Sequence, residues 1–207
     1  MRLELNKMRN SLVDISDEKL VKRYVKGDLK ALDALVERYK KPLFSFFWGL
    51  TKSKVDVDEL FQETWFRVIR KASDFEQNSF KGWIFKIAHN LVIDGYRSQR
   101  GHLSLDQASE YEGGLQTLGD TIPATGIGPD DDANNHDLRN AITQALDKLP
   151  SEQREVFVLR MEVDMSFKNI AEIQGTSTNT ALARMQYALS KMRKLLKSHR
   201  PGPERNL

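Results

Sequence analysis

The stretch Ser166–Arg184, SFKNIAEIQGTSTNTALAR, has the spacing of a helix-turn-helix. Ala171 falls in the middle of the first predicted helix, where a second helix must approach closely. Gly175 follows four residues later, where the turn favours a left-handed backbone that glycine adopts at little cost. Ala181 then lies on the inner side of the second predicted helix. In this motif the second helix enters the major groove and offers its N-terminal residues to the base edges.

The predicted second helix begins with short hydrogen-bonding side chains followed by a guanidinium. Such groups can read bases and phosphates. The same residues could instead only cap the helix, and the sequence leaves both interpretations open. A basic tail follows, to which we assign only non-specific attraction to phosphate. The residues at the start of the helix are Ser177, Thr178, Asn179, Thr180 and Arg184; the tail holds Lys191, Arg193, Lys194, Lys197 and Arg200.

The rest of the chain also shows helical periodicity, so the sequence predicts an all-α protein. We expect a helix end at Gly27 with Asp28 as the next N-cap, and a fresh helical turn after Pro42. Further helices are predicted from near Asp56 and over 79–99. After Leu138 the pattern resumes, and Pro150-Ser151 is expected to supply a stop and a new N-cap. No strand pattern and no internal repeat is evident.

Charge divides the 207 residues into three parts. Residues 1–100 carry a net charge of +6, residues 101–138 carry −8 and no Lys or Arg, and residues 139–207 carry +5. The acidic part is rich in Gly, Asp, Ser and Thr, which is typical of a flexible linker. We therefore predict two small helical domains, at 14–100 and 138–200, joined by a flexible acidic linker at 101–137, with the helix-turn-helix in the second domain.

Several classes of protein are disfavoured by composition. There is no cysteine, so a disulfide framework, a thiol nucleophile and a thiolate metal site are excluded. No apolar run approaches the ~18 residues that would span a bilayer, and the first dozen residues lack the pattern of a signal peptide. There is no Gly-rich phosphate loop, His-rich site or nucleophile–base pair, so we predict no catalytic residue, metal, cofactor or small-molecule substrate.

The predicted helix from Asp56 to Lys71 has a second face away from its apolar stripe. That face combines acidic, amide and apolar groups, which suits contact with another protein. A solvated face carrying two stray hydrophobic residues fits equally well. Without a histidine or a third ligand cluster, its acids do not indicate a metal or acid–base site. The residues are Asp58, Glu59, Gln62, Glu63, Phe66 and Ile69.

The helix predicted at 79–99 also carries a second strip, of aromatic and apolar residues. Aromatic side chains interleaved with bases and amides suit unstacked single-stranded DNA, where each stacked base is worth roughly 1–3 kcal/mol. Alternatively the strip packs on a neighbouring helix of the same domain, and the pattern does not separate the two. The strip is Phe85, His89, Ile93 and Tyr96, and the flanking residues are Lys86, Asn90, Arg97 and Arg100.

Three strings resemble the extracytoplasmic-function (ECF) type of RNA polymerase sigma factor. DVDELFQETW at Asp56–Trp65 is similar to the segment that binds the polymerase clamp helices. FKGWIFKIAHNLVIDGYR at Phe80–Arg97 resembles the segment that melts and reads the −10 promoter element. LPSEQREVFVLR at Leu149–Arg160, followed by the helix-turn-helix, resembles the domain that reads the −35 element. The strings occur in the family's order, with a linker between them.

The resemblance implies a non-enzymatic, cytoplasmic subunit that directs promoter recognition, DNA melting and initiation. Its implied partners are promoter DNA and the clamp and flap regions of core polymerase, with room for an anti-sigma factor and no membrane insertion. The implied polymerase contacts are the six residues of the Asp58–Ile69 face. The implied −10 contacts are Phe75, Asn78, Ser79, Lys86, His89, Asn90, Arg97 and Arg100. The implied −35 contacts are Arg160, Ser177, Thr178, Asn179, Thr180, Ala183, Arg184 and Tyr187.

The chain departs from the family pattern near the turn. Leu182 and Ala183 stand where many relatives carry a basic residue and a serine, which puts the −35 sequence in doubt, although a thymine methyl could accept an apolar contact. Gln174 and Thr176 replace residues that are commonly apolar. The rival interpretation is a free-standing helix-turn-helix regulator, which would bind duplex DNA without polymerase.

Overall fold

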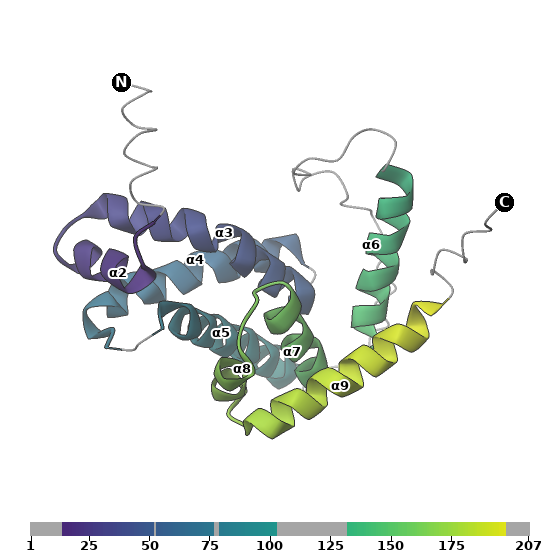
Figure 1. Ribbon diagram of the computed structural model, residues 1–207. Helices are drawn as coiled ribbons and strands as arrows, with labels where there is room; N and C mark the ends of the chain where they lie inside the picture. Colours follow the sequence, from purple (N-terminus) through teal and green to yellow (C-terminus); the bar gives the residue numbers. More distant parts are fainter. Residues whose placement is uncertain (1–13, 52, 77–78, 103–131, 198–207) are drawn as a thin grey trace.

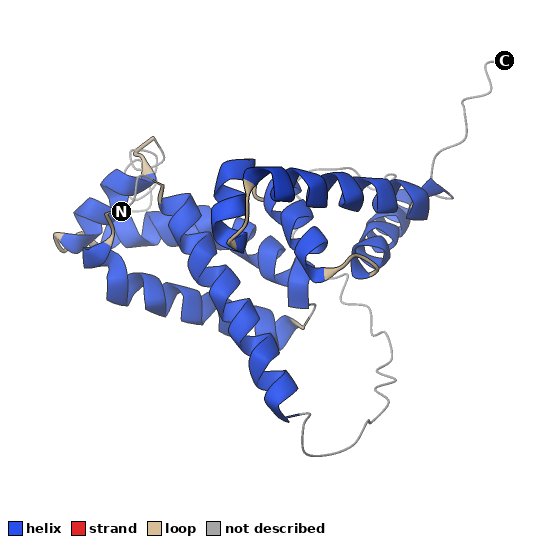
Figure 2. Cartoon of the chain, turned by 90° about the horizontal axis from the view of Figure 1, so that it is seen from below, coloured by secondary structure: helices blue, strands red, loops and turns tan. Residues whose placement is uncertain are grey.

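The computed structural model describes residues 14–51, 53–76, 79–102 and 132–197. An N-terminal domain contains α2 (Asp17–Val25), α3 (Leu29–Thr51), α4 (Lys54–Lys71), the short 3₁₀ helix η1 (Ala72–Asp74) and α5 (Phe80–His102). A C-terminal domain contains α6 (Asp132–Asp147), α7 (Ser151–Met161), α8 (Phe167–Gln174) and α9 (Thr178–Leu195). Over these ranges the chain forms helices and no strands, which confirms the predicted all-α class (Figure 2).

The two domains are packed against each other. In Figure 1, α7 and α8 lie over α5, while α6 stands apart beside the C-terminal part of α9. One buried apolar core runs through both domains, and it includes Phe46 and Phe85 of the first and Val158 and Ile170 of the second. A smaller cluster, with Leu149 and other residues, joins α6 to α9. The linker is therefore not the only connection between the domains.

Helix α3 continues through Pro42, where we had expected a fresh helical turn to begin. A proline inside a helix costs about 3 kcal/mol, because it removes a backbone N–H and crowds the carbonyl four residues earlier. The following turns bury Leu43, Phe46 and Phe47 completely. Each such side chain contributes roughly 1.5–3 kcal/mol when fully buried, which outweighs the cost of the proline.

Serine hydroxyls set the starts of several helices. Helix α4 begins at Lys54, earlier than the predicted start near Asp56, because Ser53 Oγ accepts a hydrogen bond from the Asp56 N–H at 3.3 Å. The predicted N-cap at Ser151 is wrong. Pro150 takes the cap position, and Ser151 becomes the first helical residue.

The turn between α8 and α9 has the predicted geometry. Gly175 adopts φ 62° and ψ 40°, the left-handed region. The N–H of Thr176 donates to the carbonyl of Ala171 at 2.9 Å, which closes the end of α8. Ala171 and Ala181 are both buried, and their small side chains let α8 and α9 approach closely. These contacts confirm the helix-turn-helix.

Helix α6 begins at Asp132, inside the range predicted as linker, and α5 continues to His102. The apolar periodicity used for the prediction starts only at Leu138. An acidic residue at the first position favours a helix start, because its charge complements the positive end of the helix dipole.

Candidate nucleic-acid interface

The outer face of α4 brings together the residues predicted to contact a protein. Phe66 is 59 % exposed and Ile69 is 40 % exposed, which is a high exposure for large apolar side chains. Asp58, Glu59 and Gln62 are also exposed on this helix. Glu63 is half-buried and accepts a hydrogen bond from Arg67 Nε at 2.9 Å. The helix thus presents two apolar side chains among acidic and amide groups.

The opposite face of α4 anchors this surface to the domain. Val57, Trp65 and Val68 are buried, and Thr64 is fully buried with its hydroxyl donating to the Leu60 carbonyl at 2.7 Å. The apolar stripe predicted for this helix was Val57, Leu60, Phe61, Thr64 and Val68, without Trp65. The position of Trp65 beside the apolar stripe was the signal in the sequence that it could be buried. In the structure its ring packs on the ring of Phe61, with the centroids 6.4 Å apart.

An aromatic cluster includes Phe75, which is one of the predicted −10 contacts. Phe75 is half-buried, and its ring centroid lies 5.1 Å from that of Trp83 and 5.8 Å from that of Phe80. Ser79 caps α5 by accepting a hydrogen bond from the Gly82 N–H at 3.1 Å. Asn78 lies outside the described residues. Phe75 is therefore held against two aromatic rings and is only partly exposed.

Two residues of the second strip of α5 contact different parts of the protein. Phe85 is fully buried, with ring centroids 5.4 Å from Phe46 and 6.4 Å from Tyr39, so it packs in the core and offers no surface for base stacking. His89 faces the C-terminal domain, where its Nδ1 lies 2.6 Å from Glu155 Oε1. Phe85 therefore packs on neighbouring helices of its own domain, whereas His89 contacts the other domain and its predicted contact with the −10 element stays a prediction.

The basic and amide residues of α5 have different environments. Lys86 Nζ donates to the carbonyls of Ile173 at 2.6 Å and Glu172 at 3.3 Å, both at the end of α8. Asn90 is exposed. The side chains of Arg97 and Arg100 lie outside the described part of the chain. Lys86 and His89 therefore contact the second domain in this arrangement.

The N-terminal end of α9 is open to solvent. Ser177 caps the helix by accepting a hydrogen bond from the Thr180 N–H at 3.1 Å, so the capping role foreseen as an alternative is real. Thr178 and Asn179 are exposed, and Tyr187, more than two helical turns further on, is 66 % exposed. Ala183 is half-buried. The Ser177 hydroxyl also lies 2.9 Å from the Thr180 hydroxyl, so these two hydroxyls are paired with each other, while Thr178 and Asn179 stay exposed.

Arg184 is held in place by Gln174. Its Nη1 donates to Gln174 Oε1 at 2.6 Å, and Gln174 Nε2 donates in turn to Glu155 Oε2 at 2.8 Å. A polar chain therefore runs from His89 through Glu155 and Gln174 to Arg184. In the sequence, Gln174 stood out only because it replaces a residue that is commonly apolar. In the structure, the side-chain amide of Gln174 links the buried carboxylate of Glu155 to the guanidinium of Arg184.

Glu152 stands beside this chain at the start of α7. The pKa of its carboxyl is lowered, first because the group accepts a hydrogen bond from its own backbone N–H and then because the Ser151 hydroxyl donates to it. The nearby guanidinium of Arg184 lowers the pKa further. The negative charge at this helix start thus helps to hold Arg184.

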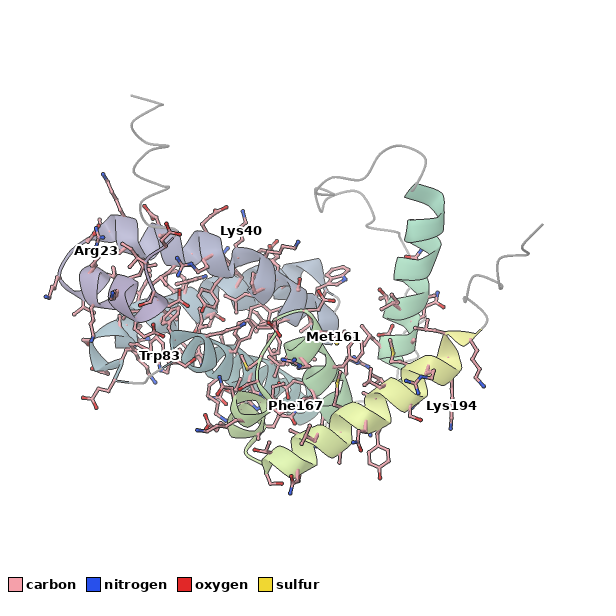
Figure 3. All side chains as sticks on the ribbon, viewed as in Figure 1. Arg23, Lys40, Trp83, Met161, Phe167 and Lys194 are labelled. Carbon is pink, nitrogen blue, oxygen red and sulfur yellow. The ribbon has the colours of Figure 1, made fainter. Side chains whose placement is uncertain are left out.

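Arg160 holds the turn between α7 and α8, which Met161 and Phe167 mark in Figure 3. Its Nη1 donates to Asp164 Oδ1 and to the Met165 carbonyl, each at 3.0 Å. Its guanidinium carbon lies 5.6 Å from the ring centroid of Phe167. With 39 % of the side chain exposed, the predicted phosphate contact remains a prediction beside this structural role.

Two features are absent from the described ranges of the chain. No group of three potential metal-ligating side chains occurs there. None of the helices seen there combines the length and the apolar character that a bilayer-crossing segment needs.

The fold and its surfaces define a two-domain helical protein with a helix-turn-helix and, on α4, a separate face of exposed apolar and acidic side chains. Family models support this description and refine it. Residues 35–102 match sigma-70 region 2, and residues 139–192 match sigma-70 region 4. The first range covers most of α3 to α5, and the second covers most of α6 to α9.

Curated relatives match over nearly the whole chain. The ECF RNA polymerase sigma factor SigW of Bacillus subtilis is 29 % identical over 181 residues, which cover 87 % of this chain and 96 % of that protein. The ECF RNA polymerase sigma-E factor of Escherichia coli is 27 % identical over 179 residues, covering 83 % of this chain and 89 % of the relative.

Solved structures share the fold. The sigma factor RpoE of Bartonella quintana, solved with the anti-sigma factor NepR, superposes with a TM-score of 0.64 at 22 % identity, covering 83 % of this chain and 99 % of that one. CnrH, solved with the cytosolic domain of CnrY, gives a TM-score of 0.58 at 23 % identity, with 88 % and 97 % covered.

The chain belongs to the sigma-70 family, in its extracytoplasmic-function group. It is a promoter-recognising RNA polymerase sigma factor, from a family of transcription initiation factors that are not known as enzymes.

Proposed function

We propose that this sigma factor divides its work among three surfaces: the outer face of α4 for the polymerase clamp, the Phe75–Ser79 loop with α5 for the −10 element, and the start of α9 for the −35 element. The observation that carries the proposal is that one chain exposes both an apolar-and-acidic helix face and an open recognition-helix end. Because its partner is RNA polymerase, the protein works in the cytoplasm.

The α4 face supplies affinity for polymerase. Phe66 and Ile69 would be removed from water on binding, and apolar burial contributes roughly 25 cal/mol per Å². Glu59, Gln62 and Glu63 would add hydrogen bonds and steer the encounter toward a basic surface. Since neither apolar side chain supports the fold of its own domain, their exposure supports a role in binding a partner.

The DNA-reading surfaces supply specificity. At the start of α9, Thr178, Asn179 and Arg184 offer donors and acceptors to base edges, and Tyr187 extends the surface. In the N-terminal domain, the loop beside Phe75 would hold an extruded base. Extrusion costs a few kcal/mol, which capture in a fitted pocket offsets.

An anti-sigma factor is a further candidate partner. The structural relative RpoE of Bartonella quintana was solved with one bound. The exposed apolar side chains of α4 would suit such a partner as well as polymerase, and the two would then compete for one surface.

The double variant Gln62→Ala/Glu63→Ala tests the polymerase surface. We expect its retention by immobilised bacterial core polymerase to fall at least tenfold, with an unchanged far-UV circular dichroism spectrum. The matched control is Asp33→Ala/Glu37→Ala, which removes two exposed acids from α3 and should bind as the wild type does. Equal retention of both variants and wild type would refute the assignment.

The variant Arg184→Ala tests the −35 surface. If Arg184 contacts a base, its loss should cost about 1–3 kcal/mol and relax specificity at one position; a phosphate contact would mainly reduce the salt dependence of binding. Footprints of the holoenzyme over a salt series distinguish these results. Unchanged footprints at every salt concentration would remove Arg184 from the interface.

A further inference from the structure

The first helix of the helix-turn-helix ends in a glutamine whose side-chain amide has a fixed orientation. Gln174 Nε2 donates to Glu155 Oε2 at 2.8 Å and to the Glu152 carbonyl at 3.1 Å. Both partners act only as acceptors, because neither a carboxylate nor a carbonyl carries a proton to donate. A flipped amide would set Oε1 against these two oxygens. The amide therefore has one favourable orientation, in which Oε1 faces Arg184.

Arg184 of α9 is bound to that oxygen. Its Nη1 donates to Gln174 Oε1 at 2.6 Å, and the charge of the Glu152 carboxylate attracts the same guanidinium. These contacts join α7, α8 and α9 within the C-terminal domain, so they do not require a contact with the N-terminal domain. A guanidinium has several N–H donors, so one bond to Gln174 does not use up its hydrogen-bonding capacity.

Arg184 lies in the middle of a row of predicted −35 contacts. Thr180 precedes it by four residues and Tyr187 follows it by three, a spacing that places the three side chains on the same side of a helix. Thr180 is exposed and Tyr187 is 66 % exposed, whereas Arg184 is half-buried. The bond from Gln174 therefore acts on the central side chain of this row.

An unrestrained arginine side chain samples many rotamers, and a ligand that binds it must select one of them. Ordering one such side chain on binding weakens affinity by about twofold to twelvefold. A hydrogen bond that restricts the side chain beforehand avoids this loss. We propose that Gln174 is a positioning residue of the −35 surface: its Oε1 holds the Arg184 guanidinium in the orientation that meets the base pair, without touching DNA itself. This role rests on the proposed −35 contact of Arg184, whereas the restriction of Arg184 in the free chain does not.

The restriction of Arg184 is measurable in the free, full-length chain by ¹⁵N relaxation of the arginine Nε–H groups, with Arg184→Ala identifying the signal by its loss. Gln174→Met replaces the amide by an apolar side chain of similar length. We expect the order parameter of Arg184 to lie above about 0.6 in the wild type and to fall below it in Gln174→Met. Gln153→Met, which changes a half-buried glutamine of α7 in the same way, is the matched control and should leave the signal unchanged. An Arg184 side chain equally mobile in the wild type and in Gln174→Met would overturn the proposal.

Base selection by the holoenzyme tests the positioning itself. A promoter found by start-site mapping with the wild-type protein is randomised over its −35 element, and the templates bound by each variant with bacterial core polymerase are sequenced. We expect Arg184→Ala to reduce the preference for one base at one position by about fivefold or more, and Gln174→Met to reduce it at the same position by about threefold or more. The double variant Gln174→Met/Arg184→Ala should match Arg184→Ala, because Gln174 acts only through Arg184. Additive losses in the double variant would contradict this.

The variant Gln174→Glu separates positioning from a merely structural role. It keeps an oxygen acceptor for Arg184, but it loses the donor to Glu155 and brings two carboxyl groups together. A structural role predicts that both the melting temperature and the base preference fall further than in Gln174→Met. Positioning predicts a base preference close to that of the wild type despite a lower melting temperature. A preference as weak as that of Gln174→Met, in folded Gln174→Glu protein, would overturn the proposal.

Each failure has its own meaning. If Arg184→Ala leaves every base preference unchanged, both the −35 contact of Arg184 and its positioning by Gln174 are wrong. If the wild-type holoenzyme shows no base preference in the −35 element, the proposed function of α9 is refuted. The relaxation measurement then still decides whether Gln174 restricts Arg184.

Discussion

The turn of the helix-turn-helix provides a quantitative test through the variant Gly175→Ala. Gly175 has φ 62°, and a Cβ at this position would meet no atom within 4 Å. The substitution therefore causes no clash, and its cost is the backbone strain of a left-handed conformation, roughly 1–2 kcal/mol for an L-residue. For a chain of this size, each kcal/mol lowers the melting temperature by about 2–4 °C, so we expect a decrease of about 2–8 °C.

Thermal unfolding followed by circular dichroism at 222 nm measures this effect. Two controls separate backbone strain from other causes. Gly175→Asn should lose less stability, because asparagine tolerates the left-handed region. Gly95→Ala, in the middle of α5, should gain up to about 1 kcal/mol from helix propensity. The reasoning fails if Gly175→Ala melts at the wild-type temperature, or if alanine and asparagine at position 175 are equally stable.

Three further variants test the fold. Pro42→Ala restores a backbone N–H inside α3 and should stabilise the chain by up to about 3 kcal/mol in urea unfolding, so a loss of stability would contradict the account. Burial of Tyr39, and then its hydrogen bond to Asp17, raise the pKa of its hydroxyl group. The protonated hydroxyl therefore contributes its full stability below the ordinary phenol pKa near 10, and this stability is lost as the pH rises beyond that value. Tyr39→Phe should cost about 1.5–3 kcal/mol of stability at pH 7 and should reduce the stability lost at alkaline pH. If the stability of the variant and of the wild type depended on pH in the same way, the role of the Tyr39 hydroxyl would be refuted. Arg160→Lys keeps the charge but loses the paired contacts at the α7–α8 turn and the stacking on Phe167, so stability should fall by about 1 kcal/mol. An unchanged unfolding midpoint would contradict this structural role and leave only the proposed DNA contact.

Features that depend on local chemistry could be predicted from the sequence. The structure has each local feature of the helix-turn-helix that residues 171–181 predict. These are the left-handed Gly175, the cap at Ser177 and the small residues Ala171 and Ala181. The helix starts were predicted less accurately, because Ser53, which caps α4, precedes the apolar pattern by several residues. At Pro42, tertiary burial of the following residues overrides the local preference.

Contacts between distant residues could not be predicted. The periodicity of α5 showed that Phe85 and His89 share a strip, but not which surface covers it. Phe85 meets the core of its own domain, whereas His89 meets Glu155, 66 residues away. Nothing in either local pattern pairs those two groups, since the partner is determined by how the domains pack.

In-vitro transcription with bacterial core polymerase on a genomic library of the source organism, with start sites mapped, tests the central claim most directly. The account predicts discrete start sites that require both the chain and core polymerase, with little binding of duplex promoters by the chain alone. Tight duplex binding by the isolated chain, without any added start sites in the presence of core polymerase, would contradict it.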